Sequence, residues 1–138
     1  MKLQICVTDE DKIEGFTSVK LQELQFAAQN IADNECEAIV ANKVLNLLDL
    51  NQVDGFLTLL NAKLRKGGTL NVSGIEPKVL CKMISNDTIK EETLNNVVSN
   101  CNSILPLKDC INMLSSKGLQ INNAVINGVE YEISAKRN

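Results

Sequence analysis

The stretch "CEAIVANKVLNLLDLNQVDGFLTLLNAKLRKGGTLNVSGI", residues 36–75, decides the fold, because two strand-like runs flank a helix-like one. Residues 36–41 are a short apolar run typical of a buried strand. From Asp49 to Arg65 the apolar residues recur at helical spacing: Val53, Phe56, Leu57, Leu60 and Leu64. We expect Gly67-Gly68 to end this helix and residues 69–75 to form the next strand. The order strand–helix–strand favours a parallel sheet with right-handed crossovers.

The rest of the chain extends this α/β pattern in both directions. Before the stretch, residues 2–7 alternate as a strand, and the weaker strand candidates are residues 16–20 and 24–28. After it we expect helices over residues 77–84, from Asp87 to about residue 100, and after Pro106. The end of the chain reads as a hairpin, because Asn127-Gly128 is a strong turn signal between two alternating runs.

Composition limits the classes of function. A chain of 138 residues fits one domain, residues 1–138. The net charge of −3 argues against nucleic acid as a partner, since phosphate contacts need clustered Lys and Arg. The absence of His excludes His-based metal sites and Ser-His or Cys-His nucleophile pairs, and we expect no metal. Five cysteines without a CxxC pair indicate reduced, mostly buried thiols, and no apolar run suits a membrane span or a signal region, so we expect an intracellular protein.

Three stretches of the sequence resemble the class I S-adenosylmethionine (SAM)-dependent methyltransferases, in the order in which that family has them. "MKLQICVTDEDKIEGFTSVK" resembles the opening "MKLNLGCG…K.EGF.NVD" of short predicted methyltransferases of phages and bacteria. Residues 36–76 resemble the family's fourth strand, the following helix and the fifth strand, with "LRKGGTL" as the most specific match. "SILPLKDCINMLSSKGLQINNAVINGVEYEISAKR" resembles the last helix and the closing hairpin.

The resemblance implies a truncated Rossmann-like fold: a mostly parallel sheet with helices on its faces and a C-terminal antiparallel hairpin. It also implies a cofactor site at the carboxyl ends of the first strands. The chain is trimmed relative to the family between its first two strands, where about eight residues replace a helix. The same resemblance suggests the cytoplasm of a bacterial or phage-infected cell.

The family's cofactor motifs are altered in this chain. The glycines that follow the first strand, which let the backbone approach the cofactor, align with Cys6-Val7-Thr8. The acidic residue that binds the ribose hydroxyls aligns with Lys20, which cannot accept their hydrogens. A remnant ligand site would therefore consist of Cys6, Thr8, Lys20, Ala41 and Asn42.

Two further regions bear on catalysis and on the adenine. The resemblance places Asp33, Asn34 and Glu35 near the adenine. After the fourth strand of the family a "LEH" motif is sometimes present, and here Asn46 and Leu47 replace its Glu and His. Neither residue takes up a proton near neutral pH, so no catalytic residue is predicted.

These residues leave three hypotheses. The first is a methyltransferase-like protein that has lost catalysis and the cofactor and serves protein contact or self-association, as a structural module, a phage accessory or a virion component. The second is a small active SAM-dependent methyltransferase with an atypical site. The third is a protein that binds another small ligand in the remnant cleft.

Overall fold

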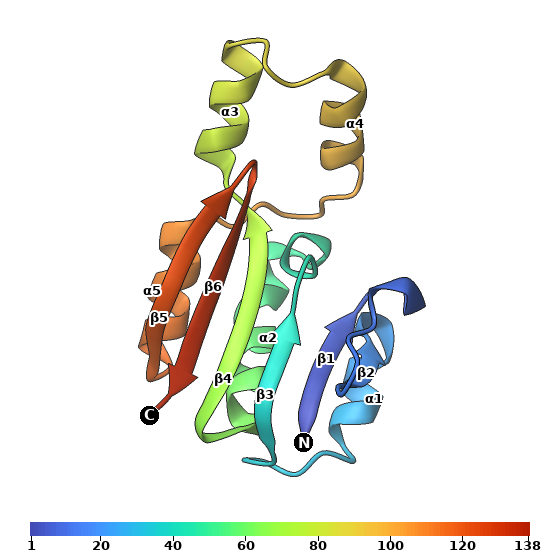
Figure 1. The fold of residues 1–138 in the computed structure, drawn as a ribbon, viewed down its shortest axis with the longest axis vertical. Helices are drawn as coiled ribbons and strands as arrows, with labels where there is room; N and C mark the ends of the chain where they lie inside the picture. The colour runs from blue at the N-terminus through green and yellow to red at the C-terminus, as the bar shows by residue number, and fades with distance from the viewer.

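A computed structural model describes all residues, Met1–Asn138, and contains one six-stranded sheet (Figure 1). The strands are β1 (Lys2–Cys6), β2 (Thr17–Lys20), β3 (Cys36–Ala41), β4 (Leu64–Ile75), β5 (Leu119–Asn127) and β6 (Glu130–Arg137). Their order is β2-β1-β3-β4-β6-β5. The first four strands are mutually parallel, and β6 is antiparallel to both β4 and β5. The expected mostly parallel α/β sheet with a C-terminal hairpin is therefore confirmed.

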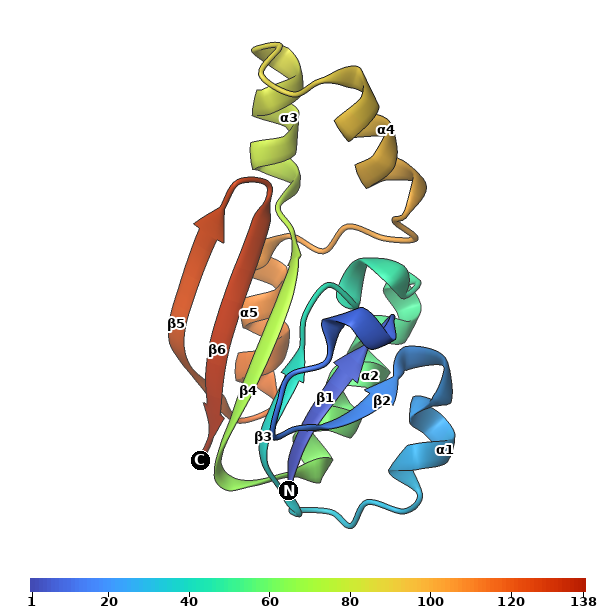
Figure 2. The same ribbon diagram turned by 45° about the vertical axis from the view of Figure 1, so that its right-hand side comes forward.

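Five helices accompany the sheet: α1 (Leu24–Ala28), α2 (Leu50–Lys63), α3 (Pro77–Ser85), α4 (Glu91–Ser99) and α5 (Leu107–Ser116). α2 and α5 lie behind the sheet and α1 lies beside β2, while α3 and α4 extend beyond the carboxyl end of β4 (Figures 1 and 2). A capping box formed by Asp49 and Gln52 fixes the start of α2. No helix is long and apolar enough to cross a membrane.

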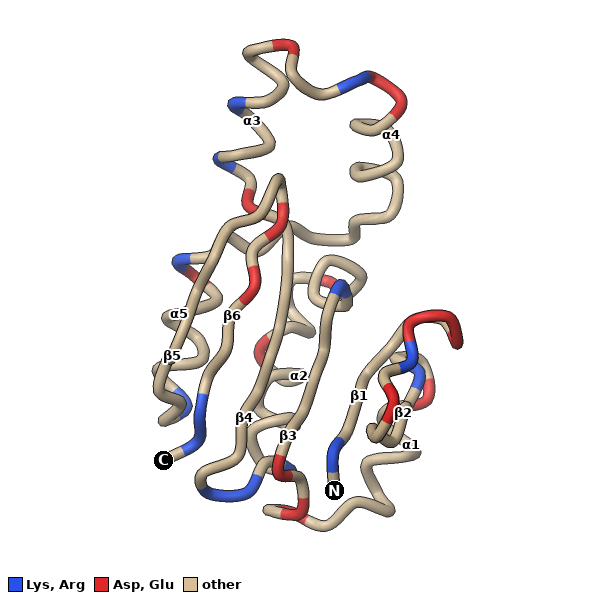
Figure 3. Tube along the Cα trace, in the orientation of Figure 1, with Lys and Arg blue, Asp and Glu red and all other residues tan.

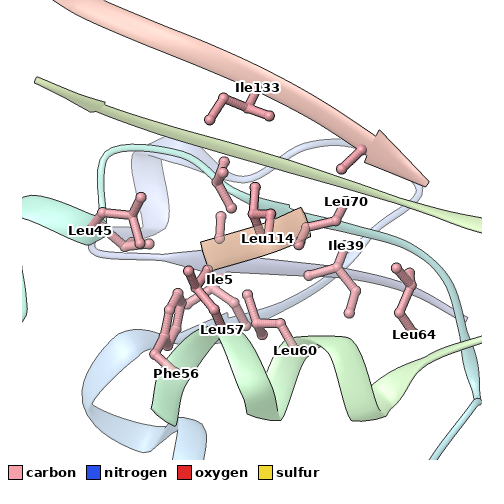
Figure 4. Close-up of a cluster of buried hydrophobic side chains, with 14 of the residues drawn as sticks. Ile5, Ile39, Leu45, Phe56, Leu57, Leu60, Leu64, Leu70, Leu114 and Ile133 are labelled. Carbon is pink, nitrogen blue, oxygen red and sulfur yellow. The ribbon is translucent and has the colours of Figure 1, made fainter. Parts of the chain in front are cut away.

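The core lies between one face of the sheet and the layer formed by α2 and α5. In Figure 4, Phe56, Leu57 and Leu60 of α2 point towards Ile5 and Ile39 of the strands. Because side chains alternate along a strand, the residues between these apolar ones face the other side. There the paired positions are small or polar: Gln4 beside Val40, Val40 beside Asn71, and Asn71 beside Ser134. Helices thus cover one face, and on the other the β1–β2 connection crosses β1 (Figure 2).

Two sequence expectations near the centre of the chain are wrong in detail. Residues 24–28 form helix α1 rather than a strand, with Leu24 and Ala28 buried one turn apart. The long helix ends at Lys63, and Gly67-Gly68 lie inside β4 instead of ending the helix. The reason is a bulge: Leu64 already pairs with Cys36, and the ladder resumes only where Thr69 pairs with Ala38.

Two boundaries in the last third of the chain are also shifted. Asp87 has φ +51° and caps no helix, and α4 begins at Glu91 after Lys90. In the hairpin, Asn127 pairs with Glu130, so the two-residue loop is Gly128-Val129, one residue later than predicted. Gly128 has φ +66°, a conformation that favours glycine at the first loop position.

Two glycines give a matched test of the packing. A Cβ on Gly74 of β4 would lie 2.6 Å from the buried Tyr131 Oη, whereas a Cβ on Gly55 of α2 would meet no atom within 4 Å. We expect Gly74→Ala to lower the free energy of unfolding by about 1–3 kcal/mol through overpacking. Gly55→Ala should raise it by about 0.5–1 kcal/mol, because alanine favours a helix interior. Urea unfolding measures both, and a Gly74→Ala protein as stable as the wild type would contradict this packing.

Candidate functional site

The order of the strands places a topological switch point between β1 and β3, and we call the region outside their carboxyl ends the crevice. From β1 the chain runs outward to β2 and then returns to β3 on the other side, so the connections after β1 and after β3 diverge at the carboxyl ends. Such a switch point is where open α/β sheets bind ligands. The site therefore consists of residues 7–16, which follow β1, and residues 42–49, which follow β3.

Gln4, in the middle of β1, attaches the first connection, residues 7–16, to the sheet by hydrogen bonds. Gln4 is 5% exposed and, because side chains alternate along a strand, faces away from the helices that cover its neighbours Leu3 and Ile5. Gln4 Nε2 donates a hydrogen bond to the Asp11 carbonyl, and Gln4 Oε1 accepts one from Ile13 N at 2.7 Å and one from Ser18 Oγ at 3.1 Å. One amide thus satisfies three partners from the connection and from β2.

The backbone immediately after β1 does not use the conformation that favours glycine. The positive-φ residues of the chain do not include Cys6, Val7 or Thr8, and Thr8 has φ −128°. The Cys6 thiol is buried and donates to the Val19 carbonyl at 3.7 Å. Thr8 Oγ1 donates to Asp11 Oδ2 at 3.1 Å, so its hydroxyl hydrogen is used within the loop.

Lys20, at the carboxyl end of β2, lies beside Cys6 in the register of the sheet. Its Nζ is 3.9 Å from Asp9 Oδ2, and Lys12 Nζ is 3.4 Å from the other oxygen of the same carboxylate. These side chains are largely exposed, so the pairs contribute little stability. Their effect is local, because they place the Lys20 ammonium group and its partner Asp9 together at the carboxyl end of β2.

The connection after β3 is held by two sets of internal hydrogen bonds. Lys43, with φ +62°, donates its N–H to Ser73 Oγ at 2.8 Å. The Asn46 carbonyl accepts from Asn102 N at 2.7 Å, and Asn102 Nδ2 donates to the Leu47 carbonyl at 2.7 Å. The segment between α4 and α5 therefore binds the backbone of the connection where the family sometimes has its "LEH" motif.

The five residues predicted for a remnant site lie on β1, β2, β3 and the connections that follow β1 and β3. Cys6 and Lys20 are neighbours, and Thr8 contacts the loop that also holds the partner of Lys20. Ala41 is fully buried, whereas Asn42 is exposed. Asn42 lines a hollow of about 390 Å³ on the face without helices, together with Asn71, Asn123, Glu132 and Ser134 of the strands.

Asp33, Asn34 and Glu35 lie at the opposite end of the sheet from this crevice, so their predicted place near an adenine is wrong. They precede β3, and the Glu35 carbonyl accepts from the Met1 amino group at 3.4 Å. Asp33 Oδ1 pairs with Lys63 Nζ at 2.9 Å, and Asn34 Oδ1 accepts from Arg137 at 2.7 Å. The physical reason is that α1 replaces the strand that would have delivered these residues to the carboxyl edge.

Two polar residues at the sheet were missed by sequence reasoning. Gln4 is a polar residue in the middle of a strand whose other central positions, Leu3 and Ile5, are apolar, and this was the available signal for a tethering role. Glu76 follows β4 and is 6% exposed, and its carboxylate accepts from Lys78 N at 3.4 Å and from Leu107 N at 3.0 Å. It joins the starts of α3 and α5. No group of three His, Cys, Asp or Glu side chains is arranged to hold a metal ion.

The groups with shifted pKa values lie in the core rather than at the crevice. Burial raises the pKa of the Cys110 thiol from its ordinary value of 9.0 to about 11, partly offset by a hydrogen bond with Tyr131. Burial, and then the neighbouring Cys110, raises the pKa of Tyr131. Burial also raises the pKa of Cys36. These groups stay protonated and neutral near neutral pH, as buried thiols and phenols do when they have no catalytic role.

Comparisons with known proteins identify the fold. No protein-family model matches the chain, and no curated protein matches it. Among solved structures, a SAM-dependent methyltransferase from Archaeoglobus fulgidus superposes with a TM-score of 0.64 at 10% identity over 96% of this chain and 74% of its own. An O-methyltransferase family protein from Burkholderia thailandensis gives 0.63 at 16% identity over 89% of this chain and 36% of its own.

A third neighbour is magnesium protoporphyrin IX methyltransferase from Synechocystis PCC 6803 with bound SAH, with a TM-score of 0.58 at 16% identity. The superposition covers 94% of this chain and 55% of the Synechocystis protein. The chain thus spans only about a third to three quarters of these proteins. At such low identity the likeness shows the fold alone: a truncated version of the class I SAM-dependent methyltransferase fold.

Gln4 gives a direct test of how the first connection is held. Replacing it by alanine removes the acceptor of Ile13 N and Ser18 Oγ and the donor to the Asp11 carbonyl, so we expect a loss of about 1–3 kcal/mol in the free energy of unfolding. Amide hydrogen exchange over residues 8–16 should accelerate at the same time. The exposed Gln22, which has no hydrogen-bond partner through its side chain, supplies the control, and Gln22→Ala should change neither quantity. Unchanged exchange in Gln4→Ala would show that the tether is unimportant.

The Cys110 thiol gives a pH-dependent prediction. Its pKa is raised in the folded state, so its contribution is fully present below pH 9 and is lost as the pH rises towards about 11. We expect the unfolding free energy of the wild type to fall over this window, and to fall less in Cys110→Ala. Urea denaturation at a series of pH values measures the difference, and parallel curves for the two proteins would contradict the shift.

Proposed function

We propose that this chain is a pseudoenzyme: a methyltransferase-fold module, one domain over residues 1–138, that neither binds SAM nor catalyses methyl transfer and that serves protein–protein contact. The observation that carries the proposal is the first connection, residues 7–16, which Gln4 ties to the sheet and whose only helical element is a 3-10 turn over Asp9–Asp11. A cofactor at this crevice needs the backbone after β1 to be free and uncovered by side chains. Here Val7 and Thr8 carry side chains where the resemblance places glycines, and the segment that follows them is attached to Gln4.

The charge at the crevice supports the same conclusion. The resemblance assigns ribose binding to an acidic residue at the end of the second strand, and this chain has Lys20 there with Asp9 as its partner. An ammonium group offers no acceptor to a hydroxyl hydrogen, and it repels the sulfonium charge of SAM. A cofactor would also have to compete with Asp9 for this position.

The connection after β3 supports the loss of catalysis. Methyl transfer needs an oriented acceptor and often a base. Asn46 and Leu47 supply no base, and their carbonyls are bonded to the segment between α4 and α5. The polar groups nearest to the family's catalytic position are therefore engaged in holding the fold.

Exposed apolar side chains support a role in contact with proteins. Phe26 of α1 is 74% exposed and Leu50 at the start of α2 is 58% exposed. A hollow of about 680 Å³ lies between the same two helices, with Leu24, Phe56 and Leu59 among its lining residues. An apolar hollow on the same two helices that carry exposed apolar side chains favours an interaction surface. A setting in a phage-infected or bacterial cell, as an accessory or virion component, belongs to this proposal through the sequence resemblance.

The alternative, a small active SAM-dependent methyltransferase, keeps one supporting observation. Asn42 is exposed at the carboxyl end of β3 and lines the hollow on the face without helices. A cofactor bound in this hollow would contact Asn42. It would have to bind without the glycines that the family has after the first strand.

Calorimetric titration with SAM and with S-adenosylhomocysteine separates the two functions. We expect no binding tighter than roughly 100 µM, about −5.5 kcal/mol. Lys20→Ala should also give no heat, since the tethered connection remains, and Lys66→Ala, an exposed lysine at the other end of the sheet, is the matched control. Tighter binding by the wild type would overturn the proposed loss of the cofactor and favour the active methyltransferase.

A further inference from the structure

β5 is an edge strand whose outer side is unpaired. It comes last in the order β2-β1-β3-β4-β6-β5 and bonds only to β6. Its nine residues are Leu119–Asn127, and every side chain from Asn122 to Asn127 is exposed. α5 packs against the face of this strand and leaves its edge open (Figure 1). The backbone groups along that edge are a template for another strand.

The opposite edge of the sheet, β2, has features that prevent pairing with another strand, whereas β5 lacks them. β2 has only four residues, ends in Lys20 and is followed directly by a helical turn. Short length and lysine are common means of preventing edge pairing. The sequence of β5, "LQINNAVIN", contains no charged residue and no proline, and Val125 and Ile126 are 44% and 48% exposed. Its one irregularity is the bulge between Ile121 and Asn123.

The charges beside β5 favour a second copy of this chain as the occupant. Glu130 and Glu132 lie at the turn end of the hairpin, and Lys136 and Arg137 lie at its other end (Figure 3). When two copies of β5 pair antiparallel, the acidic end of one hairpin faces the basic end of the other. The two copies of β6 would then be about 14 Å apart, which is three strand spacings and somewhat beyond the screening length. The charges therefore select orientation more than they add affinity.

The side chains of β5 suit pairing with an identical strand. Asn and Gln amides both donate and accept hydrogen bonds, so two identical amide-rich strands meet without a mismatch. No like charges would face each other within the strand pair. A strand from a different protein would not necessarily match these amides or avoid like charges.

We propose that β5 pairs antiparallel with β5 of a second copy about a two-fold axis, so that two six-stranded sheets join into one continuous sheet. The contact is closed, because the outer edges of the joined sheet are the two protected β2 strands. The inference rests on the contact role proposed above and assigns to it a further surface, the β5 edge, with a second copy of this chain as the partner. It does not depend on the state of the cofactor site.

Sedimentation velocity on the full chain over a range of concentrations tests the pairing. We expect a species of twice the chain mass of 15.1 kDa. Val125→Lys should raise the dissociation constant at least about tenfold, because it adds charge to the edge and removes apolar area. The fold should persist, since the new lysine lies directly across from Glu132 in the same hairpin. Thr17→Lys, the same kind of change on the opposite edge, is the matched control and should remain a dimer.

Amide hydrogen exchange of the wild type gives a second measurement that does not depend on a variant. Protection of alternate amides in residues 119–127 should rise with protein concentration. A monomer at all concentrations, a dimer that Val125→Lys leaves intact, or open-ended aggregates would each overturn the pairing. So would a monomer whose β5 becomes protected only when an unrelated strand is added. SAM binding would refute the proposed loss of cofactor without affecting these outcomes, so the two failures are distinguishable.

Discussion

Burial of a single face of the sheet is the constraint on which the rest of this structure depends. The aliphatic side chains of α2 and α5 cover the strands from one side, and this core contains few aromatic residues. The alternate residues of the same strands include polar ones that are only partly buried, as at Asn71 and Ser134. A second helical layer would have to desolvate these groups without offering them partners, which is costly. The pattern of apolar and polar residues along the strands therefore favours an arrangement of two layers, the sheet and one layer of helices.

The missing layer explains the local structure at the switch point. A parallel crossover between neighbouring strands normally carries a helix, and the link from β1 to β2 has only ten residues, 7–16. A single 3-10 turn over Asp9–Asp11 satisfies little of its backbone internally, so this link needs partners from elsewhere, and Gln4 supplies them to Asp11 and Ile13. The shortness of the connection and its attachment to the sheet therefore have one cause.

The strand–helix–strand core of residues 36–75 and the terminal hairpin could be predicted, because long runs of period 3.6 or 2 are strong local signals. Residues 24–28 could not, since five residues with only Leu24 and Ala28 buried fit either a helix or a strand. The tether by Gln4 depends on partners up to fourteen residues away, which no local pattern encodes. The error at Asp33 and Glu35 has another origin: the family order assumed a strand that this chain replaces with α1.

Polar groups can bind a ligand or a partner readily only where they have no intramolecular hydrogen bond. At the crevice, the Lys43 N–H is bonded to Ser73, and the Asn46 carbonyl to Asn102. Groups that already have intramolecular partners bind a ligand only by giving those partners up, so each such exchange yields little net free energy. Along β5 the outward backbone groups have only water to replace. By this reasoning, pairing at β5 would cost the chain fewer existing hydrogen bonds than binding a ligand at the crevice, which is the physical argument behind the proposed role in protein contact.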